Sequence, residues 1–277
     1  MELSIASTRT LNNGVAIPLL GFGVFQATAA ETIPAVKWAI EAGYRHIDTA
    51  KIYGNEAAVG KAVQESGVPR ESLFITTKLW NSDMRASRQR EAFTESLKAL
   101  QMDYVDLYLI HWPVDNFIGS WRILEEFLSQ GRARAIGVSN FQPHHISALL
   151  QKAKAVPAVN QIEIHPNLTQ KPLIALCEDK GIVCEAWSPI GGSWGVQARE
   201  EPVLKTIGKQ YSKTPVQVML RWALQRGTIP LPKSVRKERI VENSQLYDFN
   251  LTPQDMDKID ALNRDQRYGP DPDNFSF

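Results

Sequence analysis

Eight short apolar runs recur along the chain, and segments with helical patterns separate them. The runs show little alternation of apolar and polar residues, as expected of parallel strands that are buried on both faces. They lie at 19–23, 44–48, 74–79, 105–111, 133–139, 158–164, 182–187 and 228–232. Eight strands that alternate with about eight helices predict an α/β fold, the (β/α)8 or TIM barrel.

Two of the intervening segments carry clear helix signals. In residues 214–227, Thr214 followed by Pro215 is typical of a helix start, and Gly227 is typical of a helix end. The apolar residues between them recur at the spacing of one helix face. Residues 87–101 carry a similar apolar stripe, so both segments predict helices that cover the sheet.

The first residues predict a β-hairpin, because "NNG" at 12–14 favours a tight turn. We expect this hairpin to plug the floor of the barrel. No linker, repeat or shift in composition divides the chain, so residues 1–277 are expected to form one domain. The main alternative is an open doubly wound sheet. The segment "GFGVFQ" (21–26) argues against it, because glutamine stands where the dinucleotide fingerprint needs its third glycine.

The overall charge is close to neutral, with 31 Lys and Arg against 30 Asp and Glu. This balance predicts no nucleic-acid or membrane partner, so any anion site has to be a local cluster. Cys177 and Cys184 have no metal-ligand spacing and are expected to be small buried residues. No secretory signal or membrane-length apolar run is present, which predicts a cytoplasmic protein.

Polar side chains stand at or just beyond the ends of three successive predicted strands. Asp48 ends the second run and Tyr53 lies in the loop that follows it. Lys78 ends the third run and His111 ends the fourth. In barrels of this type the active site lies at the C-terminal ends of the strands. The four residues are therefore expected to converge on one rim.

Taken one at a time, these residues have ordinary structural explanations. Asp48 fits a turn cap and Tyr53 a half-buried aromatic, while Lys78 fits a strand end and His111 a core histidine. Their shared register favours the functional interpretation. Three neighbours in the same loop are expected to be solvated or to begin a helix: Lys51, Asn55 and Glu56.

The four side chains form a chemically coherent set. A phenol has a reference pKa of about 10, and a neighbouring ammonium is expected to lower it. Asp48 is expected to hold the ammonium of Lys78, and Tyr53 to act as general acid toward a carbonyl oxygen. His111 is expected to orient that carbonyl. Such a site needs a hydride donor, and the sequence has no metal-ligand constellation, which suggests a nicotinamide cofactor.

Over essentially its whole length the sequence resembles the aldo-keto reductase superfamily. The matching segments occur in order: "GYRHIDTAKIYGNE", "ITTKLW", "LYLIHWP", "AIGVSNF", "VNQIEIHP", "WSPIGG" and "LPKSVRKERIVEN". The short C-terminal tail resembles the bacterial branch that includes 2,5-diketo-gluconate and methylglyoxal reductases. The resemblance implies NADPH-dependent carbonyl reduction by a monomer, with these residues as the catalytic tetrad: Asp48, Tyr53, Lys78 and His111.

The resemblance also implies a set of cofactor contacts. Ser139, Asn140 and Gln161 are expected at the carboxamide. Trp187 is expected against the nicotinamide ring, at a position where many relatives carry tyrosine. Further expected contacts are Gly23, Val24, Ser188 and Val235.

A local cationic cluster meets the need for an anion site. Its members, within seven residues, are Lys233, Arg236, Lys237 and Arg239. Ser234 adds a hydroxyl, and a helix that starts nearby offers N–H groups. The resemblance assigns Lys233, Ser234 and Arg239 to the adenosine phosphate, which favours NADPH over NADH. Arg236 is expected to assist and Lys237 to be solvated. The residues implied near the adenine are Glu242 and Asn243.

Aromatic residues near the predicted catalytic positions are expected to wall a substrate pocket. Trp80 and Trp112 closely follow two of the tetrad residues, and Phe25 is expected opposite them. An apolar pocket with few polar anchors fits a small-molecule carbonyl substrate. Small dicarbonyls, keto-sugars and aromatic aldehydes all remain open.

Three further features have a functional and an ordinary interpretation. The loop "GGSWG", which contains Trp194, fits either a flap over the cofactor or a plain exposed loop. The tail 264–277 is expected either to drape over the pocket, with Tyr268 as a contact, or to be disordered. His144 and His145 follow a proline at a predicted helix start, and we expect an ordinary helix face there rather than a metal site.

Two other functions stay open. One is a non-catalytic NADPH-binding sensor or partner subunit, which would bind the cofactor without consuming it. The other is a barrel enzyme in which Lys78 forms a Schiff base with a carbonyl substrate. The first predicts cofactor binding without turnover, and the second predicts borohydride trapping without a nicotinamide cofactor.

Overall fold

The computed structural model describes residues 3–193 and 195–277. At its centre, eight parallel strands pair in the order β10–β9–β8–β7–β6–β5–β4–β3. They are β3 (Gly21–Gly23), β4 (His46–Asp48), β5 (Phe74–Leu79), β6 (Val105–Ile110), β7 (Ala133–Ser139), β8 (Val159–Glu163), β9 (Val183–Trp187) and β10 (Ile229–Pro230). The amide of Gly23 donates to the carbonyl of Pro232 (3.1 Å), which links β3 to the chain beyond β10. The predicted (β/α)8 barrel is confirmed.

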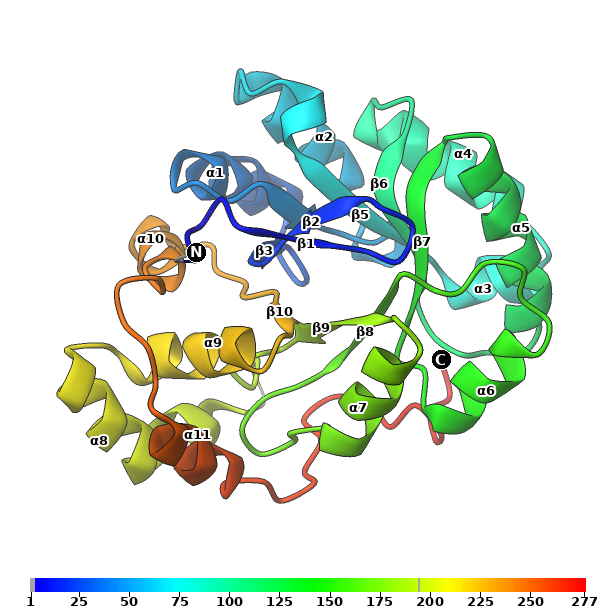
Figure 1. Cartoon of the computed structure of the whole chain (residues 1–277). Coiled ribbons are helices and arrows are strands. Elements are labelled where there is room, and N and C mark those ends of the chain that lie inside the picture. Colours follow the sequence, from blue (N-terminus) through cyan, green and yellow to red (C-terminus); the bar gives the residue numbers. More distant parts are fainter. Residues whose placement is uncertain (1–2, 194) are drawn as a thin grey trace.

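Helices surround the ring of strands (Figure 1). They are α1 (Ala29–Glu41), α2 (Glu56–Glu65), α3 (Asn81–Arg85), α4 (Gln89–Leu100), α5 (Phe117–Ser129), α6 (Pro143–Leu150), α7 (Lys171–Asp179), α8 (Pro202–Tyr211), α9 (Pro215–Gln225), α10 (Lys237–Ser244) and α11 (Pro253–Asp260). Three short 3₁₀ helices add to them: η1 (Lys51–Tyr53), η2 (Arg70–Ser72) and η3 (Val196–Glu200). Among the described residues, no helix combines the length and apolarity needed to cross a membrane.

The two helices predicted from clear signals are present. The first, α9, begins directly after Thr214, whose hydroxyl accepts a hydrogen bond from the amide of Gln217 (3.3 Å). The second, α4, begins at Gln89 and not at 87, because Ser87 adopts a left-handed φ of 54° that interrupts a helix. The local sequence signals therefore predicted both helices correctly, and only the predicted start of α4 is wrong, by two residues.

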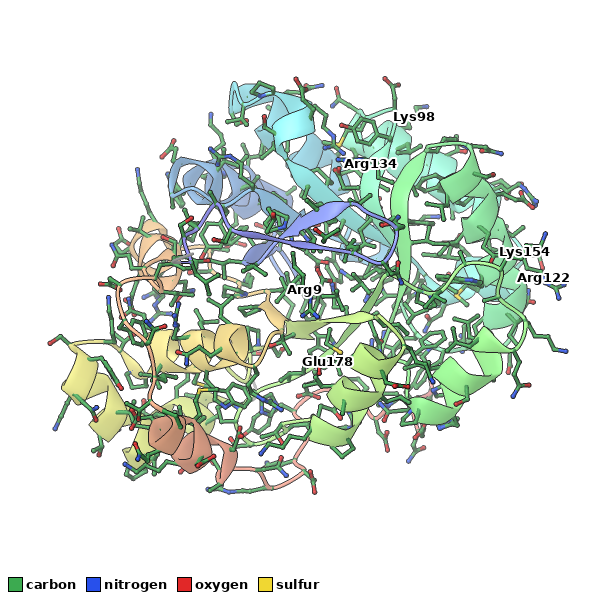
Figure 2. The ribbon with its side chains drawn as sticks, in the orientation of Figure 1. Arg9, Lys98, Arg122, Arg134, Lys154 and Glu178 are labelled. Carbon is green, nitrogen blue, oxygen red and sulfur yellow. The ribbon has the colours of Figure 1, made fainter. Side chains whose placement is uncertain are left out.

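The N-terminal hairpin consists of β1 (Thr8–Thr10) and β2 (Ala16–Pro18), which pair antiparallel. It crosses the near end of the barrel in Figure 1, and Figure 2 labels Arg9 of β1 and the nearby Arg134 of β7. Arg9 donates to the carbonyl of Gly227 (2.7 Å), just before β10. Two hairpin side chains join an apolar cluster inside the floor, with these members: Leu11, Ile17, Phe74, Leu107, Leu109, Ala135, Ala158, Val159, Val183 and Ile229. The predicted plug is thus present.

The buried interior changes character from the floor toward the C-terminal ends of the strands. Beyond the apolar cluster, several strands carry buried polar side chains: His46, Asp48, Thr76, Lys78, Gln161 and Glu185. Buried charges and polar groups are costly unless they bind one another. The sequence of these strands therefore builds a polar, mutually bonded layer directly beneath the rim.

Candidate active site

A cavity of about 530 Å³ opens at the C-terminal ends of the strands. The loops and strand ends that line it come from all around the barrel. The predicted site residues among its lining are Gly23, Phe25, Asp48, Tyr53, Trp80, His111, Trp112, Ser139, Asn140, Gln161, Trp187, Ser188 and Lys233. The structure therefore brings together most of the residues predicted for catalysis, for the substrate wall and for the nicotinamide end of the cofactor.

Lys78 lies beneath the cavity and is fully buried in β5. Its Nζ donates to Oδ1 of Asp48 (2.6 Å) and to the carbonyl of Thr49 (2.9 Å). Burial by itself disfavours the ammonium, but the charge of Asp48 and the nearby Tyr53 outweigh it and raise the pKa of Lys78. The lysine is therefore a fixed cation at neutral pH.

Tyr53 ends η1, and Nζ of Lys78 lies 5.1 Å from the centre of its ring. Burial raises the pKa of the phenol, and the charge of Lys78 offsets only part of that rise. The ammonium of Lys78 lowers this pKa as predicted, but the net shift is upward. Desolvation of a neutral phenol that must become an anion outweighs the single neighbouring charge.

His111 follows β6, and its ring packs between two aromatic side chains. The ring centres lie 5.7 Å from Tyr53 and 5.1 Å from Trp80, both in edge-to-face contact. Burial, and then the charge of Lys78, hold the pKa of His111 well below its ordinary value. The imidazole is therefore neutral and carries a single N–H.

Hydrogen bonds hold the residues predicted for the carboxamide. The hydroxyl of Ser139 donates to the carbonyl of Gln161 (2.7 Å), and Nδ2 of Asn140 donates to the carbonyl of His111 (3.0 Å). Nε1 of Trp187 donates to Oδ1 of Asn140 (2.9 Å). Asn140 and Ser188, each directly after a strand, have left-handed φ values of 66° and 49°. Such backbone conformations are uncommon for residues other than glycine and concentrate at functional sites.

The remaining residues predicted for the cofactor lie outside the cavity lining. Val24 is buried in the core next to Gly23. The others occupy the turn before α10 and α10 itself: Ser234, Val235, Arg236, Arg239, Glu242 and Asn243. The hydroxyl of Ser234 accepts from the amide of Arg236 (3.1 Å) and shapes this turn. The segment continues directly from Lys233, which does line the cavity.

The cavity lining combines an apolar wall with two cations. Its apolar wall follows β3 to β6 and consists of Phe25, Ile52, Trp80 and Trp112, joined by Phe277. The ring of Phe277 lies parallel to Trp80 with 5.8 Å between ring centres. Lys233, after β10, and Arg199, in η3 after β9, are the cations among its described lining residues. Sequence reasoning missed Ile52, Arg199 and Phe277, because nothing local marks their approach to the cavity.

The C-terminal tail reaches the cavity, but not through Tyr268. Pro270 and Phe277 line it. Tyr268 instead stacks on His165, with 4.6 Å between ring centres, and its amide donates to Oε1 of Glu163 (2.7 Å). The predicted Tyr268 contact is therefore wrong. The predicted flap residue, Trp194, lies outside the described residues.

Two other surface features were considered in the sequence. Lys51 is not simply solvated, because its Nζ pairs with Asp83 (2.9 Å) and with Glu95 (2.8 Å). The two histidines of α6, His144 and His145, place their Nε2 atoms 3.1 Å apart, and Asp273 of the tail lies 3.2 Å from the first. Nδ1 of the second accepts the amide of Gln142 (3.1 Å), which leaves its proton on Nε2. Nε2 of both imidazoles and Oδ1 of Asp273 therefore lie together where the tail passes α6.

Comparison with known proteins finds reductases by sequence and an aldo-keto reductase by structure. The Aldo/keto reductase family model matches residues 19–264. A glyoxal reductase of Bacillus subtilis (strain 168) is 50% identical over all of both chains. Methylglyoxal reductase DkgA of Escherichia coli (strain K12) is 45% identical over 96% of each chain. The crystal structure of a Bombyx mori aldo-keto reductase in complex with NADP superposes with a TM-score of 0.91 at 38% identity, covering 98% of this chain and 97% of the other.

Proposed function

The chain belongs to the aldo/keto reductase family and is an NADP-dependent carbonyl reductase, and we propose that it reduces uncharged aldehydes and ketones with Tyr53 as the general acid. The family membership agrees with the resemblance seen in the sequence, including its bacterial branch. The observation that carries the finer proposal is the convergence of Tyr53, Lys78 and His111 beside an apolar wall.

The residues of the cavity and of the turn before α10 fit nicotinamide adenine dinucleotide phosphate. The Gln161 amide gives its NH₂ to two carboxyl groups and so turns its oxygen toward a donor such as a carboxamide NH₂. Ser139, Asn140 and Trp187 would hold the same end of the cofactor. Lys233 and the following turn into α10 would hold its phosphates. When bound, NADPH supplies the hydride.

Tyr53 is suited to give a proton to the carbonyl oxygen. Because its pKa is raised, the phenol is fully protonated at neutral pH. The alkoxide that forms during reduction is a much stronger base than a phenolate, so the transfer is downhill even for this weak acid. The ammonium of Lys78 stabilises the phenolate that remains, and Asp48 fixes that ammonium.

His111 would orient the substrate. A neutral imidazole can donate its N–H to a carbonyl oxygen without competing for the role of acid. Its contacts with Tyr53 and Trp80 restrict the ring, so a carbonyl that it binds would lie near the phenol.

The distribution of charge around the cavity selects the substrate class. The wall after β3 to β6 offers aromatic and aliphatic surface, whereas the lining cations, Arg199 and Lys233, follow β9 and β10. A substrate carboxylate against the apolar wall would be desolvated without a cationic partner, which is costly. Uncharged aromatic aldehydes and small dicarbonyls are therefore favoured over keto acids.

A steady-state assay that follows NADPH consumption tests this proposal. The matched substrates are para-formylbenzoate and its methyl ester, which differ in charge but share the reacting aldehyde. We expect kcat/KM to favour the ester by about tenfold or more, since each 1.4 kcal/mol gives a factor of ten. Tyr53→Phe is expected to lower kcat by about a hundredfold or more. Equal kcat/KM values for the two substrates would contradict the charge argument.

The alternatives give different outcomes in the same assay. NADPH binding that quenches tryptophan fluorescence, without consumption of NADPH by any carbonyl, would support a binding protein. The Schiff-base alternative is disfavoured, because a lysine that forms a Schiff base must lose its proton and the pKa of Lys78 is raised.

A further inference from the structure

A second acidic side chain lies beneath the catalytic residues. Glu185, in β9, is fully buried, although it stands in a run whose other members are mostly apolar. Its Oε2 accepts a hydrogen bond from Nε2 of Gln161 (2.9 Å), its partner in register on β8. Its Oε1 has no hydrogen-bond partner among the described residues. The reaction as described above makes no use of this carboxyl group.

Gln161 joins this carboxyl group to the catalytic ion pair. The same Nε2 also donates to Oδ2 of Asp48 (2.8 Å), while Oδ1 of Asp48 accepts from Lys78. Two hydrogens of one amide are therefore shared between two carboxyl groups. This arrangement fixes the orientation of the amide and couples the charge of Glu185 to the Asp48–Lys78 pair over short distances.

Little positive charge surrounds Glu185. The titratable groups that face it are His46 and Asp48 from β4 and Lys78 from β5. Nε2 of His46 lies 3.7 Å from Oε1, but burial, and then Lys78, lower the pKa of this imidazole to about 3, so it is neutral. From β3, Gly21 packs on the same ring: a Cβ there would lie 2.7 Å from Nδ1 of His46. From β10, the partner in register is the apolar Ile229.

Glu185 is consequently a neutral acid at neutral pH. Burial, followed by the negative charge of Asp48, raises the pKa of its carboxyl group to about 8, against the opposing effects of Gln161 and Lys78. Of the two carboxyl groups bound to Gln161, only Asp48 then carries a charge. The single ammonium of Lys78 is matched by a single carboxylate.

We propose that Glu185 is a positioning residue of the reductase, which fixes the Gln161 amide while protonated and slows carbonyl reduction when it ionises. This inference rests on the proposed role of Tyr53. Donation of the phenol proton leaves a phenolate beside the Asp48–Lys78 pair. A second carboxylate in the same buried network opposes that developing charge, so the protonated form of Glu185 is the faster one.

The test is the pH dependence of kcat and kcat/KM for para-nitrobenzaldehyde at saturating NADPH. For the wild-type enzyme we expect a fall of up to about tenfold from pH 7 to pH 9, since one unit above its pKa about a tenth of a group stays protonated. In Glu185→Gln the amide oxygen can still accept from Gln161 but cannot ionise. We expect this variant to keep activity within about threefold of wild type at pH 7 and to lose most of the fall above pH 8.

Glu56→Gln is the matched control. Glu56, at the start of α2, is also buried, and burial raises its pKa, but its bond is to the hydroxyl of Thr77 (2.6 Å) and not to Gln161. Its pH profile is expected to follow wild type. An independent readout is the infrared carbonyl band of a protonated carboxyl group. The wild-type band should shift with ¹³C-glutamate labelling, disappear between pH 7 and pH 9, and be absent from Glu185→Gln.

The outcomes separate this inference from the proposed function. If Glu185→Gln and wild type have the same basic limb, or if wild type has no fall above pH 8, the inference is overturned while the reductase assignment stands. A protonated-glutamate band that Glu185→Gln removes but that persists at pH 9 in wild type would also overturn it. If wild type consumes no NADPH with any carbonyl, the proposed function itself fails.

Discussion

At the scale of single residues, burial decides the charge states of the site. It raises the pKa of Tyr53, lowers that of His111 and raises that of Glu185. Burial disfavours the proton on Lys78, but Asp48, 2.6 Å away, is the main group that keeps it there. One ion pair thus stands among groups that burial keeps neutral, which is the arrangement that the proposed role of Tyr53 as proton donor requires.

Replacing Lys78 by methionine tests the importance of that ion pair. Lys78→Met leaves the buried carboxylate of Asp48 without its partner, which should cost about 3 kcal/mol of unfolding free energy and lower kcat by about a hundredfold. Urea unfolding and steady-state kinetics measure the two effects. Lys51→Met is the control, because that partly exposed lysine also bridges two acids, and a loss of about 1 kcal/mol or less with unchanged kcat is expected. Full activity in Lys78→Met would remove the lysine from the mechanism.

At the scale of elements, the start of α9 also holds α10. The hydroxyl of Thr214 accepts from the amide of Gln217 and donates to Oε1 of Glu242 in α10 (2.7 Å). Nε2 of Gln217 donates to the carbonyl of Glu242 (3.1 Å). The capping box therefore satisfies free backbone amides at the start of α9. At the same time it orients α10, the helix predicted to bind the adenosine phosphate.

Thr214→Ala should lower the unfolding free energy by about 1 kcal/mol or slightly more, because it removes the cap of α9 and leaves Glu242 without this donor. Thermal and urea unfolding measure this loss. Thr206→Ala is the control within a helix: its exposed hydroxyl only donates back to the carbonyl of Pro202 (2.9 Å). Alanine there should be neutral or slightly stabilising. Equal losses of unfolding free energy in the two variants would show that the cap at Thr214 stabilises the protein no more than the hydroxyl of Thr206 does.

At the scale of the whole molecule, the apolar cluster that stabilises the barrel floor and the residues of the candidate site lie at opposite ends of the barrel axis. Its floor is closed by the hairpin and filled with apolar side chains, while its rim carries the charged layer and the cavity. Stabilising contacts at the floor can therefore be changed without touching the site.

Ile17→Ala tests this separation. Ile17 is fully buried in the floor cluster, so its truncation should cost about 3 kcal/mol of unfolding free energy and leave kcat and KM for an aldehyde unchanged. Val15→Ala, in the same hairpin but only half-buried, should cost about 1 kcal/mol. A large change in kcat for Ile17→Ala at a temperature where it stays folded would mean that the floor and the rim are coupled.

Much of the architecture was predictable because it depends on local patterns. The strands at 74–79 and 133–139 have the predicted bounds, since each is a short, mostly buried run without period-two alternation. The strands at 19–23 and 44–48 were predicted too long: only Gly21–Gly23 and His46–Asp48 pair with their neighbours. The convergence of Asp48, Lys78 and His111 was also predictable, because a regular βα repeat brings successive strand ends to one rim.

Charge states and contacts across the barrel were not predictable in this way. Gln161 meets Asp48 across 113 residues of sequence, and nothing near either residue indicates that contact. The net rise of the Tyr53 pKa, the neutral acid at Glu185 and the approach of Phe277 to the cavity likewise follow from neighbours supplied by distant segments. Residue order sets the repeating units and hence the barrel. Desolvation and through-space charge act only once those units have closed, and they set the protonation states with which the site works.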